Sequence, residues 1–368
     1  MYLLTLDTFG YIIVIVDTFV SIIHYLITQN RVEREIMKHE IWELKQMQSM
    51  PLDIKIKMTE HRIRDWYDYW GGEVYVSFSG GKDSTVLLDI VRRLYPDVEA
   101  VFINTGLEYP EIQSFVKTFD NVRILYPKKS FSQVISEYGY PVLSKEISNA
   151  LYYAKKIPDG KCAKRSFYSP SSKYHDYSRF IPVLSMDFNA SSVCCNVLKK
   201  SPVHRFSKES GKKAITAQMA SESFLRLQNW LSHGCNSFVS KNPISNPLSF
   251  WTENDVLLYI KEHNLPICSV YGDIVSESEQ LSLFPDERFK CSGCQRTGCI
   301  FCGFGCQYDV GQTRFQRLKR THPKHYNFCI GGGQYNDFGL WVPSKEGLGL
   351  GHVFDELNKV YGDNFIRY

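Results

Sequence analysis

A short run of glycine, hydroxyl and lysine residues carries the most informative chemistry of this chain. An alternating apolar stretch that starts at Val74 precedes the run and a helix-period apolar stretch follows it, so the run is predicted to form a strand-to-helix turn. Glycine at such a turn lets backbone N–H groups converge, and the positive end of the new helix favours an anion there. The spacing differs from that of the Walker loop. The run therefore predicts a phosphate-binding loop made of Ser79, Gly80, Gly81, Lys82, Asp83 and Ser84.

Cysteines form the second group with chemical potential. The chain has 11 of them, five between Cys291 and Cys306, and an adjacent pair at Cys194 and Cys195. An odd, uneven set does not fit a secreted disulfide framework, so we expect a reducing intracellular compartment and a metal site. The two Cys-x2-Cys pairs lie too close together for a zinc ribbon, whereas a cubane cluster accepts thiolates from near and distant positions. The pattern favours a [4Fe–4S] cluster, with zinc or unmetallated thiols as alternatives.

Strand and helix patterns alternate after the phosphate loop. We expect further strands at 100–104, 122–126 and 214–219, helices at 110–119, 130–138 and 193–207, and a helix capped by Thr252 with Asp255 as its partner. This alternation predicts an α/β fold with a doubly wound parallel sheet. Ligands of such sheets bind beyond the carboxyl ends of the strands, where Thr105 to Glu108 would lie beside the phosphate loop.

The chain divides into four predicted parts. An apolar leader (1–30) and two N-terminal helices (31–72, with helical patterns at 31–48 and 58–70) precede the nucleotide-binding α/β domain (73–268). That domain contains a Ser-, Tyr- and Pro-rich segment, 158–190, which reads as an insertion outside the core. A cysteine-rich segment, a basic helix and a Gly-rich tail follow (269–368).

The leader leaves three interpretations open. Phe9 to Ile27 is long enough to span a bilayer, but Asp17 would cost about 2.5–3.5 kcal/mol at its centre. A membrane anchor, a packed or partner-facing helix and a dispensable extension all fit. The net charge of +4 demands neither a membrane nor a nucleic acid. We expect a cytoplasmic protein without membrane association, and an oligomer is compatible with the sequence.

Four motifs in a fixed order resemble those of the phosphoadenosine phosphosulfate (PAPS) reductase family, which belongs to the PP-loop, adenine-nucleotide α-hydrolase-like superfamily. The resemblance covers about residues 73–306. Its motifs are Ser79 to Ser84 followed by Asn104 to Glu111, the Cys194-Cys195 segment ending at Pro202, Asn246 to Pro266, and Gly298 to Cys302. It implies a C-terminal cysteine-rich region that binds the cluster. We expect Cys195, Cys294, Cys299 and Cys302 as its ligands, because Cys299 and Cys302 match the cysteine pair of the family and Cys294 lies closest to them across a Gly turn. Cys194, Cys291 and Cys306 are the alternates.

The resemblance leaves the reaction open. Reductases of this family use a cysteine in a C-terminal Glu-Cys-Gly-Leu/Ile-His motif, which is missing here; Cys329 is the nearest candidate. The complete glycine loop suits ATP instead, cleaved to AMP and pyrophosphate while an acceptor is adenylated for sulfur transfer. The leading interpretation is therefore a sulfur-transfer enzyme of the ATP pyrophosphatase type. A sulfonucleotide (PAPS or APS) reductase using Cys329 and a nucleotide-binding regulatory or defence module with a structural cluster are the alternatives.

Roles for individual residues follow the resemblance. Lys82 is expected to neutralise phosphate charge, and Asp83 either caps the helix or ligates Mg²⁺ directly or through a bridging group. The ribose and adenine are expected at Thr105, Gly106 and Glu108, and an anionic group of the substrate at Lys199, Lys200 and Arg205, with Gln218, Ser221 and Arg226 closing the pocket.

Two kinds of partner are expected besides the nucleotide. One is a protein that donates sulfur or electrons. The other is a nucleic acid, because the basic segment Arg314 to Tyr326 interleaves cations with aromatic residues and follows the cysteines directly.

Overall fold

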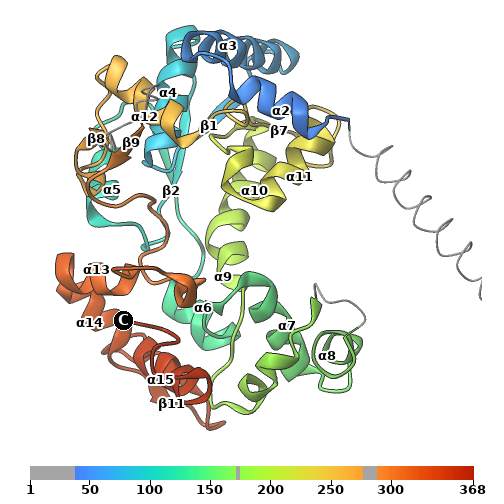
Figure 1. Cartoon of the computed structure of the whole chain (residues 1–368), viewed down its shortest axis with the longest axis vertical. Helices are drawn as coiled ribbons and strands as arrows, with labels where there is room; N and C mark the ends of the chain where they lie inside the picture. Colours follow the sequence, from blue (N-terminus) through green and yellow to red (C-terminus); the bar gives the residue numbers. More distant parts are fainter. Residues whose placement is uncertain (1–37, 171–174, 277–287) are drawn as a thin grey trace, which may run out of the picture. The chain divides into compact units, whose positions relative to one another are not determined.

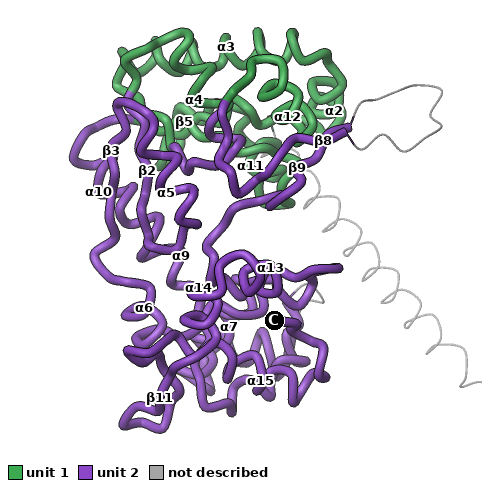
Figure 2. The backbone as a smooth tube through the Cα atoms, turned by 90° about the vertical axis from the view of Figure 1, so that its left-hand side faces the viewer, with its two compact units in different colours: residues 1–77, 86–98, 213–265 green, residues 78–85, 99–212, 266–368 purple. Residues whose placement is uncertain are grey.

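The computed structural model describes residues 38–170, 175–276 and 288–368 (Figure 1). The chain splits into two compact units, shown green and purple in Figure 2. Unit 1 comprises residues 1–77, 86–98 and 213–265, and unit 2 comprises residues 78–85, 99–212 and 266–368. The predicted leader, including Phe9 to Ile27, lies outside the described residues. No helix within the described ranges is long and apolar enough to cross a membrane.

Unit 1 combines parallel strands with helices. Strand β1 pairs in parallel with β5, which pairs in parallel with β7, and β6 runs antiparallel to β7. The elements are α2 (Ile41–Gln48), α3 (Leu52–Tyr69), β1 (Val74–Ser77), most of α4 (Lys82–Leu94), β5 (Lys213–Ile215), η5 (Ala220–Glu222), α11 (Phe224–His233), β6 (Asn236–Ser237), β7 (Ile244–Ser245) and α12 (Glu253–Glu262).

Buried polar contacts join α3 to α12 inside unit 1. The Lys55 ammonium donates to both carboxylate oxygens of Asp255 at 2.8 and 2.7 Å, and the Trp251 indole donates to the Thr59 hydroxyl at 2.9 Å. Asp255 also completes the capping box with Thr252, which confirms the predicted start of α12. Helix α3 begins earlier than the predicted residue 58 because Pro51, which favours the entry to a helix, stands at its N-cap.

Unit 2 contains the strands that follow the phosphate loop. Strands β2 and β3 pair in parallel from Ala100 opposite Val122 to Ile103 opposite Leu125, as the alternation predicts. The elements of its first part are β2 (Ala100–Ile103), α5 (Pro110–Val116), β3 (Val122–Leu125), α6 (Phe131–Tyr138), β4 (Val142–Leu143), α7 (Lys145–Lys156), α8 (Lys161–Ala163), η1 (Lys164–Tyr168), η3 (Ser178–Ser185), α9 (Val193–Cys195), η4 (Asn196–Lys200) and α10 (Ser201–Ser210).

The segment 158–190 is more regular than its composition predicts. It holds the short helices α8, η1 and η3, and it buries Phe167 and Phe188 almost completely. Those aromatic side chains give the segment an apolar anchor that a periodicity search overlooks, because they are separated by polar and proline-containing stretches.

The C-terminal part of unit 2 ends in three neighbouring helices, drawn orange to red in Figure 1. The Phe315 ring of α13 packs edge-on against Phe354 of α15 with 5.0 Å between ring centroids, and both side chains are fully buried. The elements are η6 (Ser269–Tyr271), β8 (Ile274–Ser276), β9 (Phe289–Cys291), β10 (Gly303–Phe304), η7 (Cys306–Tyr308), α13 (Arg314–Thr321), α14 (Pro323–Ile330), β11 (Gln334–Tyr335), β12 (Trp341–Val342) and α15 (Leu350–Tyr361).

The main sheet is mostly parallel, and helices follow its strands along the chain. This arrangement confirms the predicted α/β, doubly wound fold class.

Candidate functional site

The predicted phosphate loop is a tight turn closed by its own hydroxyl groups. Gly80 has a φ of +70°, and a Cβ there would meet side-chain carbons of Val116 and Ile112 at 2.8 and 2.9 Å, so the position requires glycine. The Ser79 N–H donates to the Ser84 hydroxyl at 3.1 Å, and that hydroxyl donates to the Gly81 carbonyl at 2.9 Å. The backbone is thereby held in a turn at the start of α4, where an anion is favoured.

Lys82 is buried at the first position of α4, with 2% of its surface exposed. Its ammonium donates to the Gln295 carbonyl at 3.1 Å and lies 3.6 Å from a carboxylate oxygen of Asp83. Asp83 stands in the first turn of α4 with its side chain 27% exposed. A charged lysine and an accessible carboxylate therefore lie together at the loop.

The loop that follows β2, Thr105 to Glu108, is held by hydrogen bonds between its own residues. Both carboxylate oxygens of Glu108 accept hydrogen bonds from Thr105, from its N–H at 3.0 Å and its hydroxyl at 2.7 Å. Gly106 has a φ of +75°, as a sharp turn requires. The Leu107 carbonyl accepts from the Ile300 N–H at 2.8 Å. This bond ties the loop to the Cys-x2-Cys turn.

Four thiols surround one small apolar cavity of about 20 Å³ in unit 2. Two come from the adjacent pair at the end of α9, and two come from the turn between β9 and β10. The lining residues are Leu107, Phe131, Pro141, Cys194, Cys195, Leu198, Lys199, Cys299 and Cys302. Four thiols from one adjacent pair and one Cys-x2-Cys turn match the donor set of a [4Fe–4S] cluster. No group of three or more His, Cys, Asp or Glu side chains that could hold a single metal ion occurs in the described ranges.

The pKa values of the two adjacent thiols, Cys194 and Cys195, are shifted in opposite directions. The pKa of the Cys195 thiol is lowered to about 6 because it accepts a hydrogen bond from Cys194. Burial opposes this shift, whereas the cations of Lys145, Lys199 and Lys200 add to it. The same hydrogen bond and burial raise the pKa of Cys194. Cys195 is thus ready to act as a thiolate ligand.

Lys199 supplies positive charge inside the thiol cavity. Burial alone lowers the pKa of its ammonium, but the thiols of Cys299 and Cys195 raise it above the usual value overall. Burial raises the pKa of Cys299, and it raises that of Cys302 to about 11. These two thiols need a cation or a metal to ionise at neutral pH.

A larger cavity of about 670 Å³ adjoins the same turn and shares Cys299 and Cys302 with the thiol cavity. It is rich in cations and contains one carboxylate. Its lining residues are Tyr109, Lys145, Cys294, Gln295, Arg296, Thr297, Gly298, Cys299, Ile300, Cys302, Asp309, Val310, Gln312, Arg314 and Arg317. The Asp309 carboxylate is already paired, because it accepts hydrogen bonds from the Arg314 guanidinium at 2.7 and 2.9 Å. The remaining charge favours an anionic ligand beside the thiols.

Residues 73–157 and 144–303 match the family described as the phosphoadenosine phosphosulfate reductase domain, which is more than half of the chain. The chain belongs to the PAPS reductase family. As a member of that family it has a nucleotide-binding, PP-loop type of fold, and named relatives are enzymes.

Among curated relatives of this family member, adenosine 5'-phosphosulfate reductase of Anoxybacillus flavithermus is 28% identical over 25% of this chain and 38% of its own length. The Staphylococcus haemolyticus enzyme of that name is 25% identical over 56% of this chain and 68% of its own. The matched segment thus spans well under half of the first relative. The solved U34-tRNA thiolase NcsA from Methanococcus maripaludis, with its [4Fe–4S] cluster, is similar over 58% of this chain and 66% of that chain, at 15% identity and a TM-score of 0.32.

The other predicted cysteines of this PAPS reductase family member lie elsewhere in unit 2. Cys294 lines the larger cavity, and its thiol donates to the Arg296 carbonyl at 2.8 Å. Cys291 and Cys306 are buried in β9 and at the start of η7. Cys329 has no exposed surface in α14, where burial raises its pKa well above the usual value. A thiol buried in this way is inert unless the helix moves.

The predicted polar residues are also spread over several places. Lys200 is exposed, and Arg205 donates to the Tyr126 carbonyl at 3.1 Å. Gln218, Ser221 and Arg226 belong to unit 1, where Arg226 pairs with Glu222. Two residues at the site were not predicted: Lys145, which lines the larger cavity, and Tyr271, whose phenol oxygen accepts from the Lys82 N–H at 3.3 Å. Lys145 begins α7 two residues after strand β4 ends, and its place at a strand-to-helix turn could have indicated it.

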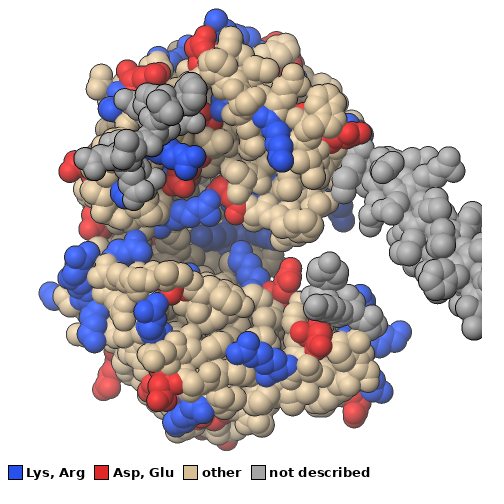
Figure 3. All heavy atoms as spheres, in the orientation of Figure 1, with Lys and Arg blue, Asp and Glu red and all other residues tan. Residues whose placement is uncertain are grey.

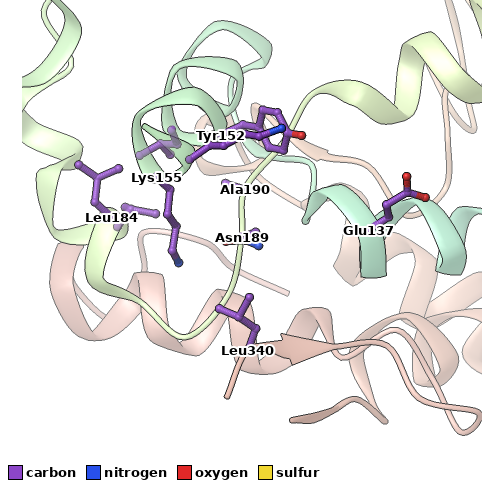
Figure 4. A pocket seen from close by; sticks show the side chains of 10 residues that line it. Glu137, Tyr152, Lys155, Leu184, Asn189, Ala190 and Leu340 are labelled. Atoms are coloured by element: carbon purple, nitrogen blue, oxygen red, sulfur yellow. The ribbon is translucent and has the colours of Figure 1, made fainter. Parts of the chain in front are cut away.

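A further cavity of about 420 Å³ lies between α7 and the chain around Asn189 in this family member (Figure 4). Its Lys155 ammonium donates to the Met186 and Phe188 carbonyls, each at 2.7 Å, and burial lowers the pKa of that ammonium. The residues that line it include none of the predicted site residues. They are Glu137, Leu151, Tyr152, Lys155, Lys156, Val183, Leu184, Asn189, Ala190 and Leu340.

Proposed function

We propose that this protein cleaves ATP to AMP and pyrophosphate in order to activate an acceptor for sulfur transfer. The observation that supports this proposal most strongly is the direct link between the phosphate loop and the cysteine segment, where the Lys82 ammonium donates to the Gln295 carbonyl. Cys299 and Cys302, two of the four thiols that line the small cavity, lie a few residues further along that segment. The hydrogen bond from Lys82 and the thiols of Cys299 and Cys302 therefore support a proposal that couples phosphate chemistry to sulfur chemistry within unit 2.

The chemistry proceeds in two displacements. An acceptor oxygen attacks the α phosphorus of ATP, the bond from that phosphorus to the pyrophosphate oxygen breaks, and pyrophosphate leaves with Mg²⁺. Lys82 and the N–H groups at the start of α4 bind the charge on the leaving pyrophosphate, and Asp83 is the carboxylate available to the Mg²⁺. A sulfide-level sulfur nucleophile from a donor protein then attacks the activated carbon, and AMP leaves with the former acceptor oxygen.

The thiols of Cys194, Cys195, Cys299 and Cys302 are the proposed ligands of a [4Fe–4S] cluster. When bound, the cluster supplies a carrier for the sulfur atom. Lys199 offsets the negative charge of the thiolates in the apolar cavity, and Leu107 and Phe131 help to keep water out of it.

We further propose a nucleic acid as the acceptor. Lys and Arg side chains gather over α13 at the left edge of the face in Figure 3. Lys319, Arg320 and Lys324 are exposed on α13 and α14, while Arg317 of the same helix lines the larger cavity beside the thiols. A phosphate backbone on these cations would bring a base to the thiols.

The experiment is a product assay with anaerobically purified protein, ATP, Mg²⁺, a nucleic acid as acceptor and a sulfide donor, with sulfonucleotide in a parallel reaction. The proposal expects AMP and pyrophosphate in equal amounts, and their loss in Lys82→Met. Sulfite from the sulfonucleotide, abolished in Cys329→Ser, would instead indicate a reductase. ATP binding with neither product would indicate a regulatory nucleotide-binding module.

A further inference from the structure

Two groups from the cysteine-rich part of unit 2 already engage the donors of the phosphate loop. The Lys82 N–H, at the start of α4, donates to the Tyr271 phenol oxygen at 3.3 Å. The Lys82 ammonium donates to the Gln295 carbonyl and lies 5.6 Å from the centre of the Tyr271 ring. Both are neutral oxygens at places where this loop would bind phosphate oxygens.

A third oxygen completes this group. The Tyr271 hydroxyl and the Thr297 hydroxyl are hydrogen-bonded to each other at 2.7 Å. A Cβ placed on Gly81 would lie 3.1 Å from the Tyr271 oxygen and 3.5 Å from the Thr297 oxygen. Both hydroxyls therefore lie directly against the glycine of the loop, in space that a phosphate held by the loop must share.

The three residues belong to one connected piece of structure. The Gly293 N–H donates to the Tyr271 carbonyl at 2.8 Å, and the Cys294 N–H donates to the Val270 carbonyl at 2.9 Å. Gln295 and Thr297 lie between Cys294 and Cys299 in the sequence. A displacement of the Tyr271 hydroxyl therefore pulls on the segment that carries the thiols.

We propose that Tyr271, Gln295 and Thr297 form a latch that nucleotide phosphates open, and that the opening moves the Cys294–Thr297 segment at the entrance to the thiols. This inference rests on the proposed function and adds its regulation. Phosphate oxygens are charged and form stronger hydrogen bonds to the ammonium and N–H groups than a phenol or a carbonyl does, so ATP displaces the latch. Because coupling is reciprocal, the state of the thiol segment also sets the affinity for ATP.

The first test is the dissociation constant of ATP for the full chain, measured by calorimetry. Tyr271→Phe removes the hydrogen bond from the Lys82 N–H and the bond to Thr297, and Thr297→Val removes the second of these alone. We expect each variant to bind ATP at least about five-fold more tightly, the effect of one neutral hydrogen bond. Tyr308→Phe, an exposed tyrosine in the same unit, is the control and should bind as the wild type does. A thermal melt identifies a variant that fails to fold, and the other variant then carries the test.

The outcomes separate the latch from the function that it regulates. Equal or weaker ATP binding by both folded variants would overturn the latch, since the hydroxyls would then help to hold phosphate or do nothing. That result would not affect the proposed function, which is tested separately by the formation of AMP and pyrophosphate. A wild-type protein that binds no ATP would overturn both.

The second test measures the coupling to the cysteine segment. Cys294 is only 4% exposed, and its thiol donates to the Arg296 carbonyl. We expect ATP to accelerate alkylation of Cys294 by iodoacetamide several-fold in the wild type, as mapped by mass spectrometry. Tyr271→Phe should react faster without ATP and respond less to it. An unchanged or slower reaction of Cys294 on adding ATP to the wild type would contradict the coupling.

Discussion

Replacing Asp309 by Asn should loosen the turn that carries the last cysteines. The Asp309 carboxylate accepts three hydrogen bonds from Arg314, from its backbone N–H at 3.0 Å and from its guanidinium at 2.9 and 2.7 Å. The guanidinium in turn donates to the Phe304 carbonyl at 2.8 Å, next to Cys302 and Cys306. The side chains of Asp309 and Arg314 are 17% and 36% exposed.

The expected loss in free energy of unfolding lies between the values for a buried ion pair and for an exposed one. Breaking a buried ion pair costs about 3–5 kcal/mol, and an exposed pair contributes about 0.2–1 kcal/mol. Because Arg314 is partly exposed and Asn keeps one acceptor oxygen, we expect Asp309→Asn to lower the free energy of unfolding by about 2 kcal/mol at neutral pH.

The effect should depend on pH in a defined direction. Burial alone raises the pKa of Asp309, but the hydrogen bonds and charge of Arg314 outweigh it and lower the pKa below 3.8. A carboxyl group whose folded pKa is lowered contributes stability above its unfolded pKa and loses it as the pH falls through the folded pKa. The difference between wild type and variant should therefore be constant between about pH 6 and 8 and shrink below about pH 4.

The assay is urea denaturation of both proteins across that pH range. Asp337→Asn, an exposed aspartate in the same unit, is the control and should change the free energy of unfolding by less than about 0.5 kcal/mol. A change for Asp309→Asn no larger than that of the control, or one that grows as the pH falls below 4, would refute the reasoning.

Three further changes test the site. Lys82→Met should weaken ATP binding at least about ten-fold in calorimetry, since a charged donor is lost; unchanged affinity would exclude Lys82 from the phosphate site. Cys302→Ser should lose iron on anaerobic purification while Cys306→Ser keeps it, and equal iron contents would contradict the proposed ligands. Cys329→Ser should lower the free energy of unfolding by about 1–3 kcal/mol in urea because it buries a hydroxyl in an apolar place, whereas unchanged stability would show that the thiol is accessible.

Local patterns predicted the parts of the site that a few neighbouring residues determine. The tight turn at Ser79 to Ser84 depends on Gly80 at a positive φ and on hydroxyls within five residues, so the local sequence indicates the turn. Phosphate binding at this turn stays a prediction. The local sequence also indicates the capping box of Thr252 and Asp255. The strand-and-helix alternation likewise predicted the parallel pairing of β2 with β3.

Contacts between distant segments were not predictable in this way. The choice of ligands among the cysteines stays a prediction. Cys294 was chosen because it lies near Cys299 in sequence, whereas in the structure its thiol donates to the Arg296 carbonyl and Cys194 lines the thiol cavity. That choice depends on side-chain direction, which the spacing does not determine. Tyr271 reaches the phosphate loop across 189 residues, and no motif marks it.

The central claim is that one chain joins an ATP-cleaving loop to a thiol-bound cluster. Its most direct test is a single anaerobic preparation analysed for iron and acid-labile sulfide and then incubated with ATP, Mg²⁺, a nucleic acid and a sulfide donor. The account predicts about four iron and four sulfide per chain, together with equal amounts of AMP and pyrophosphate. Stoichiometric zinc without sulfide, or ATP left intact by a cluster-loaded protein supplied with nucleic acid and a sulfide donor, would contradict it.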